Sequence, residues 1–167
     1  RLPGVETTSG PLGSGLGQAA GIAYAARMDK KKFRTYCFMS DGEQEEGSTW
    51  EAIMAAGHRK LDNLVVIIDY NNLNSFEKVS ETFNNFAPLR EKFESFGWGV
   101  LEIDGHDVTE IYKTLSQVPF KKDKPSVIVA KTIKGKGISF MENNPPWHYK
   151  VPNSEEYELA MKELSVK

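Results

Sequence analysis

The sequence lacks several features that would assign it to a particular class of protein. It contains one cysteine, Cys37, in 167 residues, which excludes a disulfide framework or a cysteine-rich metal site and favours a cytoplasmic protein. It has no apolar run close to the ~20 residues of a membrane-spanning helix and no signal-peptide pattern at its start, so we expect no membrane partner. It has no excess of basic residues, since its formal net charge is −2, so we expect no nucleic-acid partner.

The composition is sufficient for one folded domain. Apolar residues make up 40% and charged residues 26% of the chain, as in a globular domain of ordinary size. The chain begins with Arg1-Leu2-Pro3-Gly4 rather than with methionine. We therefore expect residues 1–167 to be one domain of a longer polypeptide, without the upstream part.

Short β-rich runs alternate with helical patterns. The runs that predict strands are residues 36–40, 64–70, 99–103 and 126–132. The patterns that predict helices are residues 15–31, residues 48–61, a segment starting at Pro88, a segment capped by Asp107 and Glu110, and an exposed terminal helix over 154–167. The stripe of the second helix expected to face the core is Trp50, Ile53, Met54, Gly57 and Leu61. This alternation predicts an α/β fold with a doubly wound, mainly parallel sheet and helices on both faces.

An acidic cluster follows the first predicted strand in the segment CFMSDGEQEEG, residues 37–47. Carboxylates in a first helical turn are favoured by the helix dipole by roughly 0.3–1 kcal/mol each, so Glu43, Glu45 and Glu46 fit a solvated helix start. The alternative is that part of the cluster binds a cation. That alternative requires further oxygen ligands close to the cluster.

Polar residues also follow the second predicted strand, as Asn71-Asn72-Leu73-Asn74. If the two strands are neighbours, their carboxyl ends lie at one edge of the sheet, so Asp41 and Asn71 approach within a few ångströms of each other. One carboxylate, one amide oxygen and one backbone carbonyl form the kind of oxygen site that holds Mg²⁺ together with water and phosphate. Gly42, which has no side chain, allows its backbone to approach a phosphate.

The glycine-rich stretch TSGPLGSGLG, residues 8–17, precedes the first predicted helix. Glycines before a helix serve packing and turns as often as ligand binding. Pro11 restricts one backbone angle while Gly10, Gly13 and Gly15 leave others free, which suits a backbone that faces a flat ligand. On this stretch alone both interpretations stay open.

Several other side chains have two interpretations each. His106 follows a strand, where it either belongs to a turn or faces the active edge of the sheet. Lys134 and Lys136 either contact an anionic substrate or lie in a solvated loop. Cys37 is expected to be a small core residue.

Together these residues resemble the diphosphate-binding half of the thiamine diphosphate enzymes, and the transketolases in particular. Asp41-Gly42, followed after twenty-eight residues by Asn71-Asn72, is similar to the family's Gly-Asp-Gly and Asn-Asn signature, with Ser40 in place of the first glycine. Three further stretches resemble transketolases: TTSGPLGSGLGQAAGIAYA, EEGSTWEA and KTIKGKGISFMENNPPWHYK. The resemblance covers nearly the whole chain and extends to separately encoded amino-terminal subunits.

The resemblance implies which residues would hold the cofactor, thiamine diphosphate. The metal ligands would be Asp41, Asn71 and the carbonyl of Leu73, with Mg²⁺ as the ion and Ca²⁺ or Mn²⁺ as alternatives. Gly42 would approach a diphosphate oxygen through its backbone. The residues lining the aminopyrimidine side would be Gly10, Pro11 and Leu12.

Two further residues would take part in catalysis by the same resemblance. His148, in PPWHYK, is similar to the histidine that touches the diphosphate and the substrate region, with Tyr149 where the family usually has glycine. Glu46 occupies the position of a glutamate that belongs to an acidic network at the interface between two active sites.

The function implied is that of a transferase which moves a two-carbon ketol unit from a ketose phosphate to an aldose phosphate. In the family, a carboxylate from the pyrimidine-binding domain of the facing subunit activates the cofactor. We therefore expect this chain to be inactive alone, and to act in a dimer or heterotetramer with a pyrimidine-binding partner.

One alternative function is that of a thiamine diphosphate enzyme with a 2-oxo acid donor, as in deoxyxylulose phosphate synthase or the 2-oxo acid dehydrogenases. Another is a non-catalytic assembly domain of the same fold.

Overall fold

The computed structural model describes residues 3–8, 10–83 and 87–165. In chain order its elements are α1 (Gly15–Met28), β1 (Thr35–Ser40), the 3₁₀ helix η1 (Gly42–Glu45), α2 (Gly47–His58), β2 (Leu64–Tyr70), α3 (Val79–Thr82), α4 (Leu89–Ser95), β3 (Gly99–Asp104), α5 (Val108–Ser116), β4 (Ser126–Lys131), the 3₁₀ helix η2 (Pro145–His148) and α6 (Ser154–Ser165). All four predicted strands are present, each within one residue of its predicted limits. Within the described ranges, no helix is both long and apolar enough to cross a bilayer.

The strands form one parallel sheet in the order β1-β2-β4-β3. β2, with the sequence LVVIIDY, pairs with β1 on one side and with β4 on the other. Its apolar run is typical of a strand covered on both faces. Ser40, the last residue of β1, lies opposite Asp69 near the end of β2. The segments that follow β1 and β2 therefore leave the sheet next to each other at the same edge.

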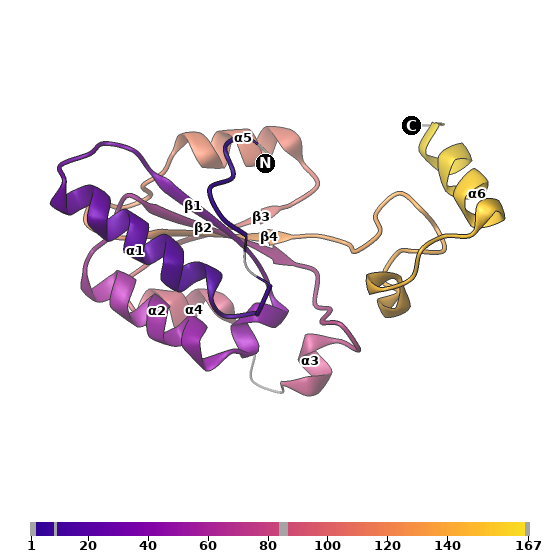
Figure 1. Cartoon of the computed structure of the whole chain (residues 1–167), viewed down its shortest axis with the longest axis horizontal. Helices are drawn as coiled ribbons and strands as arrows, with labels where there is room; N and C mark the ends of the chain where they lie inside the picture. Colours follow the sequence, from indigo (N-terminus) through magenta and orange to yellow (C-terminus); the bar gives the residue numbers. More distant parts are fainter. Residues whose placement is uncertain (1–2, 9, 84–86, 166–167) are drawn as a thin grey trace.

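Helices lie on both faces of the sheet, which confirms the predicted fold class (Figure 1). On one face, α1, α2 and α4 cover the larger core cluster, which includes Ile53, Phe93 and Trp98. On the other face, α5 packs against β3 over a smaller cluster that includes Ile103 and Ile128. The strands are thus buried mainly by side chains from one layer of helices.

The face that carries α5 is only partly covered by the described residues. On β1, the side chains of Tyr36 and Phe38 are 51% and 72% exposed. The pocket on this face is lined in part by Phe38 and Ile67 of the sheet and by Ile111 and Leu115 of α5. β1 therefore presents an apolar outer surface.

Several helices differ in detail from their prediction. α1 ends at Met28 and α2 ends at His58, each three residues before its predicted end. The core stripe of α2 is narrower than expected, because Ile53 is fully buried whereas the Met54 side chain is 54% exposed. α4 begins at Leu89, and Pro88 precedes it as an extended N-cap residue rather than as the first helical residue. The face that α2 buries depends on the elements packed around it, which local sequence patterns do not specify.

Of the two hydrogen bonds in the capping box predicted for α5, only the one accepted by the Asp107 side chain is formed. The Asp107 carboxylate accepts hydrogen bonds from the backbone N–H groups of Thr109 and Glu110, at 2.8 and 3.1 Å. The Glu110 carboxylate instead accepts from the backbone N–H of Asp104, at 3.0 Å. Glu110 thus joins the helix to the end of β3, and the reciprocal capping box that we predicted is not formed.

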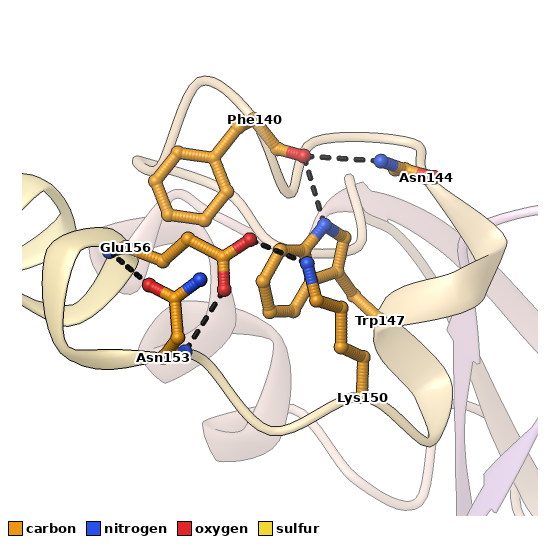
Figure 2. Close-up of polar contacts among 6 residues, drawn as sticks. All are labelled: Phe140, Asn144, Trp147, Lys150, Asn153 and Glu156. Atoms are coloured by element: carbon orange, nitrogen blue, oxygen red, sulfur yellow. Dashed lines mark hydrogen bonds and ion pairs between the residues drawn. The ribbon is translucent and has the colours of Figure 1, made fainter.

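After β4 the chain leaves the sheet and forms a C-terminal arm, residues 132–165, that contains η2 and α6 (Figure 1). Several contacts lie within the arm (Figure 2). The carbonyl oxygen of Phe140 accepts from the Trp147 indole N–H at 3.0 Å, and Lys150 pairs with Glu156. The Asn153 and Glu156 side chains each accept from the other's backbone N–H at 2.9 Å, which forms a capping box for α6.

Cys37 on β1 is 7% exposed, which confirms it as a core residue. Burial, together with the nearby charge of Glu43, raises the pKa of its thiol to about 11.

At pH 8 only roughly 0.1% of such thiols are ionised, and the thiolate is the reactive form. We expect iodoacetamide to modify the native protein at least ~100-fold more slowly than the guanidinium-unfolded protein. Mass spectrometry over time measures both rates, and equal rates would contradict the burial.

Candidate functional site

The Asp41 carboxylate joins the segments that follow β1 and β2. One of its oxygens, Oδ1, accepts from the backbone N–H of Gly42 at 2.9 Å, and Oδ2 accepts from the backbone N–H of Asn72. The backbone N–H of Asp41 donates to the carbonyl of Asp69 at 3.2 Å. The two segments therefore meet at the sheet edge, and the Asp41 side chain is completely buried between them.

Asn71 and Leu73 lie in the second of these segments. The Asn71 amide oxygen accepts from the backbone N–H of Leu73 at 2.9 Å, and its amide nitrogen lies 3.4 Å from Oδ1 of Asp69. The same Asp69 oxygen accepts from the Thr132 hydroxyl at the end of β4. Asp69 is a second carboxylate at this edge, and the sequence pattern did not indicate it because it lies inside an otherwise apolar strand.

The electrostatics of Asp41 fit a bound cation. Burial raises the pKa of its carboxyl to about 6, the N–H groups of Asn72 and Gly42 oppose that rise, and the charge of Asp69 adds to it. A divalent cation would stabilise the ionised form that burial disfavours. Among the described residues there is no group of three or more His, Cys, Asp and Glu side chains that could hold a metal. A metal here would need amide and carbonyl oxygens beside one carboxylate, which is a donor set that suits Mg²⁺.

The acidic cluster has three separate structural roles. Glu43 is 8% exposed, and its carboxylate accepts from the backbone N–H of Gly13 at 3.0 Å. Oε1 of Glu45 lies 3.4 Å from the Asn74 amide nitrogen and accepts from the Thr82 hydroxyl at 3.2 Å. Glu46 is exposed at the N-cap of α2. The prediction that these glutamates lie in a solvated helix start is therefore wrong for Glu43, which is buried.

Residues 10–14 of the glycine-rich stretch form a turn directly before α1. The residues predicted to line a ligand are all exposed: Gly10, Pro11 and Leu12. The Ser14 hydroxyl donates to the Pro11 carbonyl at 2.8 Å, which closes the turn. The turn is joined to η1 through Gly13 and Glu43, so it lies next to the segment that carries Asp41.

His148 in η2 approaches the segment that follows β2. Its Nε2 lies 3.4 Å from the Ser75 hydroxyl, and its ring meets that of Tyr149 edge to face at 4.6 Å between centroids. Tyr149 also lies against Phe76, at 6.4 Å between ring centroids. The middle of the C-terminal arm thus contacts Ser75 and Phe76, in the segment that also contains Asn71 and Leu73.

Two of the remaining candidates have defined contacts. Nε2 of His106 accepts from the backbone N–H of Ile133 at 2.8 Å, which ties the turn after β3 to the segment after β4. Lys136 lies 3.9 Å from Glu142 within its own loop. His106 therefore combines a turn position with a place at the carboxyl edge of the sheet.

A parallel sheet with polar residues gathered at the carboxyl ends of its strands is typical of α/β domains that bind ligands at this edge. Over residues 1–165 the chain matches the family described as "Transketolase, thiamine diphosphate binding domain", and it belongs to that family. The resemblance identified from the sequence is therefore confirmed.

The curated relatives include transketolase subunits. The chain is 43% identical over 164 residues to one subunit of the apulose-4-phosphate transketolase of Phocaeicola vulgatus, covering 98% of this chain and 58% of that protein. It is 40% identical over 164 residues to a 6-deoxy-6-sulfo-D-fructose transketolase subunit of Clostridium sp., covering 98% of this chain and 59% of that protein. The chain thus spans less than two thirds of the length of these relatives.

Solved transketolase structures have the same fold. The transketolase of Campylobacter jejuni superposes with a TM-score of 0.89 at 36% identity, over 97% of this chain and 26% of that chain. A transketolase of Leishmania mexicana superposes with a TM-score of 0.73 at 25% identity, over 98% of this chain and 29% of that chain.

Proposed function

We propose that this chain is the thiamine diphosphate- and Mg²⁺-binding component of a transketolase-type enzyme. The enzyme would transfer a two-carbon ketol unit from a ketose phosphate to an aldose phosphate. The observation that carries the proposal is the buried Asp41 carboxylate at the junction of two strand ends, in a chain of the transketolase family. A buried carboxylate at the carboxyl edge of a parallel sheet would hold a cation, and the cation would neutralise the charge of the carboxylate and of a diphosphate.

Each predicted residue has a role in this proposal. Asp41, Asn71 and the Leu73 carbonyl would hold the metal, and the backbone of Gly42 would face a diphosphate oxygen. The turn of residues 10–12 would support the aminopyrimidine. When bound, thiamine diphosphate supplies the electron sink for cleavage of a carbon–carbon bond. The residues of this chain bind and orient it.

His148 would orient the substrate or the diphosphate from the C-terminal arm. Its imidazole is exposed and lies within reach of Ser75, so it is accessible from the sheet edge where Asp41 lies. The Asn71 amide oxygen would turn from the Leu73 N–H toward the metal when the cofactor binds.

A pyrimidine-binding subunit or domain would complete the active site, in a dimer or heterotetramer. Two observations support a separate partner: relatives are named as subunits of transketolases, and Glu46 is exposed at the N-cap of α2. An exposed carboxylate at this position is available to a facing subunit.

Reconstitution tests the function. The full-length chain would be combined with its partner, Mg²⁺ and thiamine diphosphate, and ketose consumption would be followed with an aldose phosphate acceptor. We expect turnover only when all components are present. Release of carbon dioxide from a 2-oxo acid would instead support the alternative donor class. Absence of any cofactor binding would support the assembly domain and overturn the proposal.

A further inference from the structure

Gly13 is held from both sides by residues of η1 and α2. Its backbone N–H donates to the Glu43 carboxylate at 3.0 Å, and its carbonyl accepts from the Ser48 hydroxyl at 2.9 Å. Its φ of +77° lies in the left-handed region that favours glycine. A Cβ at this position would lie 2.4 Å from the Ser48 hydroxyl oxygen and 2.7 Å from Cβ of Glu46. Only glycine fits this close approach.

Glu43 is fixed by its own backbone to the segment that carries Asp41. Its N–H donates to the Ser40 hydroxyl at 3.2 Å, and its carbonyl accepts from the buried Thr49 hydroxyl at 2.8 Å. Asp41 is two residues earlier, at the N-cap of the same 3₁₀ helix. A displacement of the Glu43 carboxylate would therefore displace Gly13 relative to Asp41.

The buried position of Glu43 argues for a specific task. An apolar side chain of similar size would fill the same space without the cost of desolvating a charge. What an apolar side chain does not provide is an acceptor for the Gly13 N–H.

We propose that Glu43 is a positioning residue that couples the glycine-rich turn to the Asp41 segment, so that both contact one bound cofactor. This inference rests on the proposed function and adds a residue to which the family resemblance assigns no role. Glu43 acts through Gly13 and is not itself placed against the cofactor.

Glu43→Leu removes the acceptor and keeps most of the volume, whereas Glu43→Gln keeps an acceptor oxygen. Glu51→Leu is the matched control, because Glu51 lies nearby on α2 and is exposed. For each full-length variant, three quantities are measured: the Kd for thiamine diphosphate at saturating Mg²⁺, the hydrogen-exchange rate of the Gly13 amide, and the Tm without cofactor.

We expect Glu43→Leu to weaken cofactor binding by about 10-fold and to speed exchange at Gly13 by about 10-fold, the effects of one lost charge-assisted hydrogen bond. Its Tm should fall by no more than ~4 °C. Glu43→Gln should stay within about 3-fold of wild type in both quantities, and Glu51→Leu should be unchanged.

Wild-type affinity in Glu43→Leu, or equal losses in the Leu and Gln variants, would overturn the positioning role. A large fall in Tm that accounts for the loss of affinity would show a general structural role instead. If the wild-type protein binds no cofactor, the proposed function fails first. The exchange rate of the Gly13 amide then still decides whether Glu43 holds the turn.

Discussion

Replacement of Asp41 by alanine is expected to abolish Mg²⁺-dependent binding of thiamine diphosphate while the fold is retained. Asp41 supplies the carboxylate at the junction of the segments after β1 and β2. Loss of an outer-shell partner of a metal typically costs 10–100-fold in affinity or activity, so loss of the ligand itself should cost at least about 100-fold. Isothermal titration calorimetry measures binding, and far-UV circular dichroism reports the fold.

The companion variant Asp41→Asn separates charge from geometry. Asparagine keeps one oxygen acceptor for the N–H of Gly42 or Asn72 but carries no charge. We expect it to fold like the wild type and to bind cofactor as poorly as the alanine variant, because Asp41 is the one negatively charged residue among the proposed metal ligands. Cofactor binding by either variant at wild-type affinity would refute the metal assignment.

Gly57→Ala is expected to destabilise the protein strongly, although helix propensity alone favours alanine by about 1 kcal/mol. An added Cβ at Gly57 would lie 1.8 Å from the backbone oxygen of Phe96. Since that atom belongs to the backbone between α4 and β3, it cannot move aside as a flexible side chain does. We expect a loss of about 3 kcal/mol or more and a Tm lower by ~6–12 °C, measured by calorimetry.

Gly21→Ala in α1 is the matched control for this prediction. No heavy atom lies within 4 Å of a Cβ built at Gly21, so only the helix propensity changes. This variant should gain about 0.5–1 kcal/mol of stability. If the two variants had the same Tm, α2 would not pack against Phe96 as closely as described.

The strands and the major helices could be predicted because their signals are local. The run LVVIIDY indicates a buried strand by itself, and β2 has the predicted limits. The short elements α3, η1 and η2 were not predicted, because they have four residues each and are stabilised by contacts with distant segments. The exposure of Met54 likewise depends on where α2 lies in the layer and not on helical periodicity.

In the site, too, features that follow from local patterns could be predicted, whereas contacts between distant segments could not. The rule that parallel strands gather ligands at their carboxyl ends placed Asp41 beside the segment of Asn71 and Asn72, and those segments do meet. The contact of Glu43 with Gly13 spans 30 positions, and that of Glu45 with Thr82 spans 37. No spacing rule within one element predicts such pairs. The metal and cofactor roles themselves stay predictions until they are measured.

The apolar outer surface of β1 has a practical consequence for handling the protein. β1 is at one end of the described sheet order and exposes Tyr36 and Phe38, and aromatic edge strands of this kind promote aggregation. The preceding residues 30–32 are all lysine, and Arg34 directly precedes the strand. Repulsion between these positive charges on two copies of the chain opposes pairing at this edge. We therefore expect the protein to aggregate more readily when these cations are neutralised, by acetylation or at very high salt.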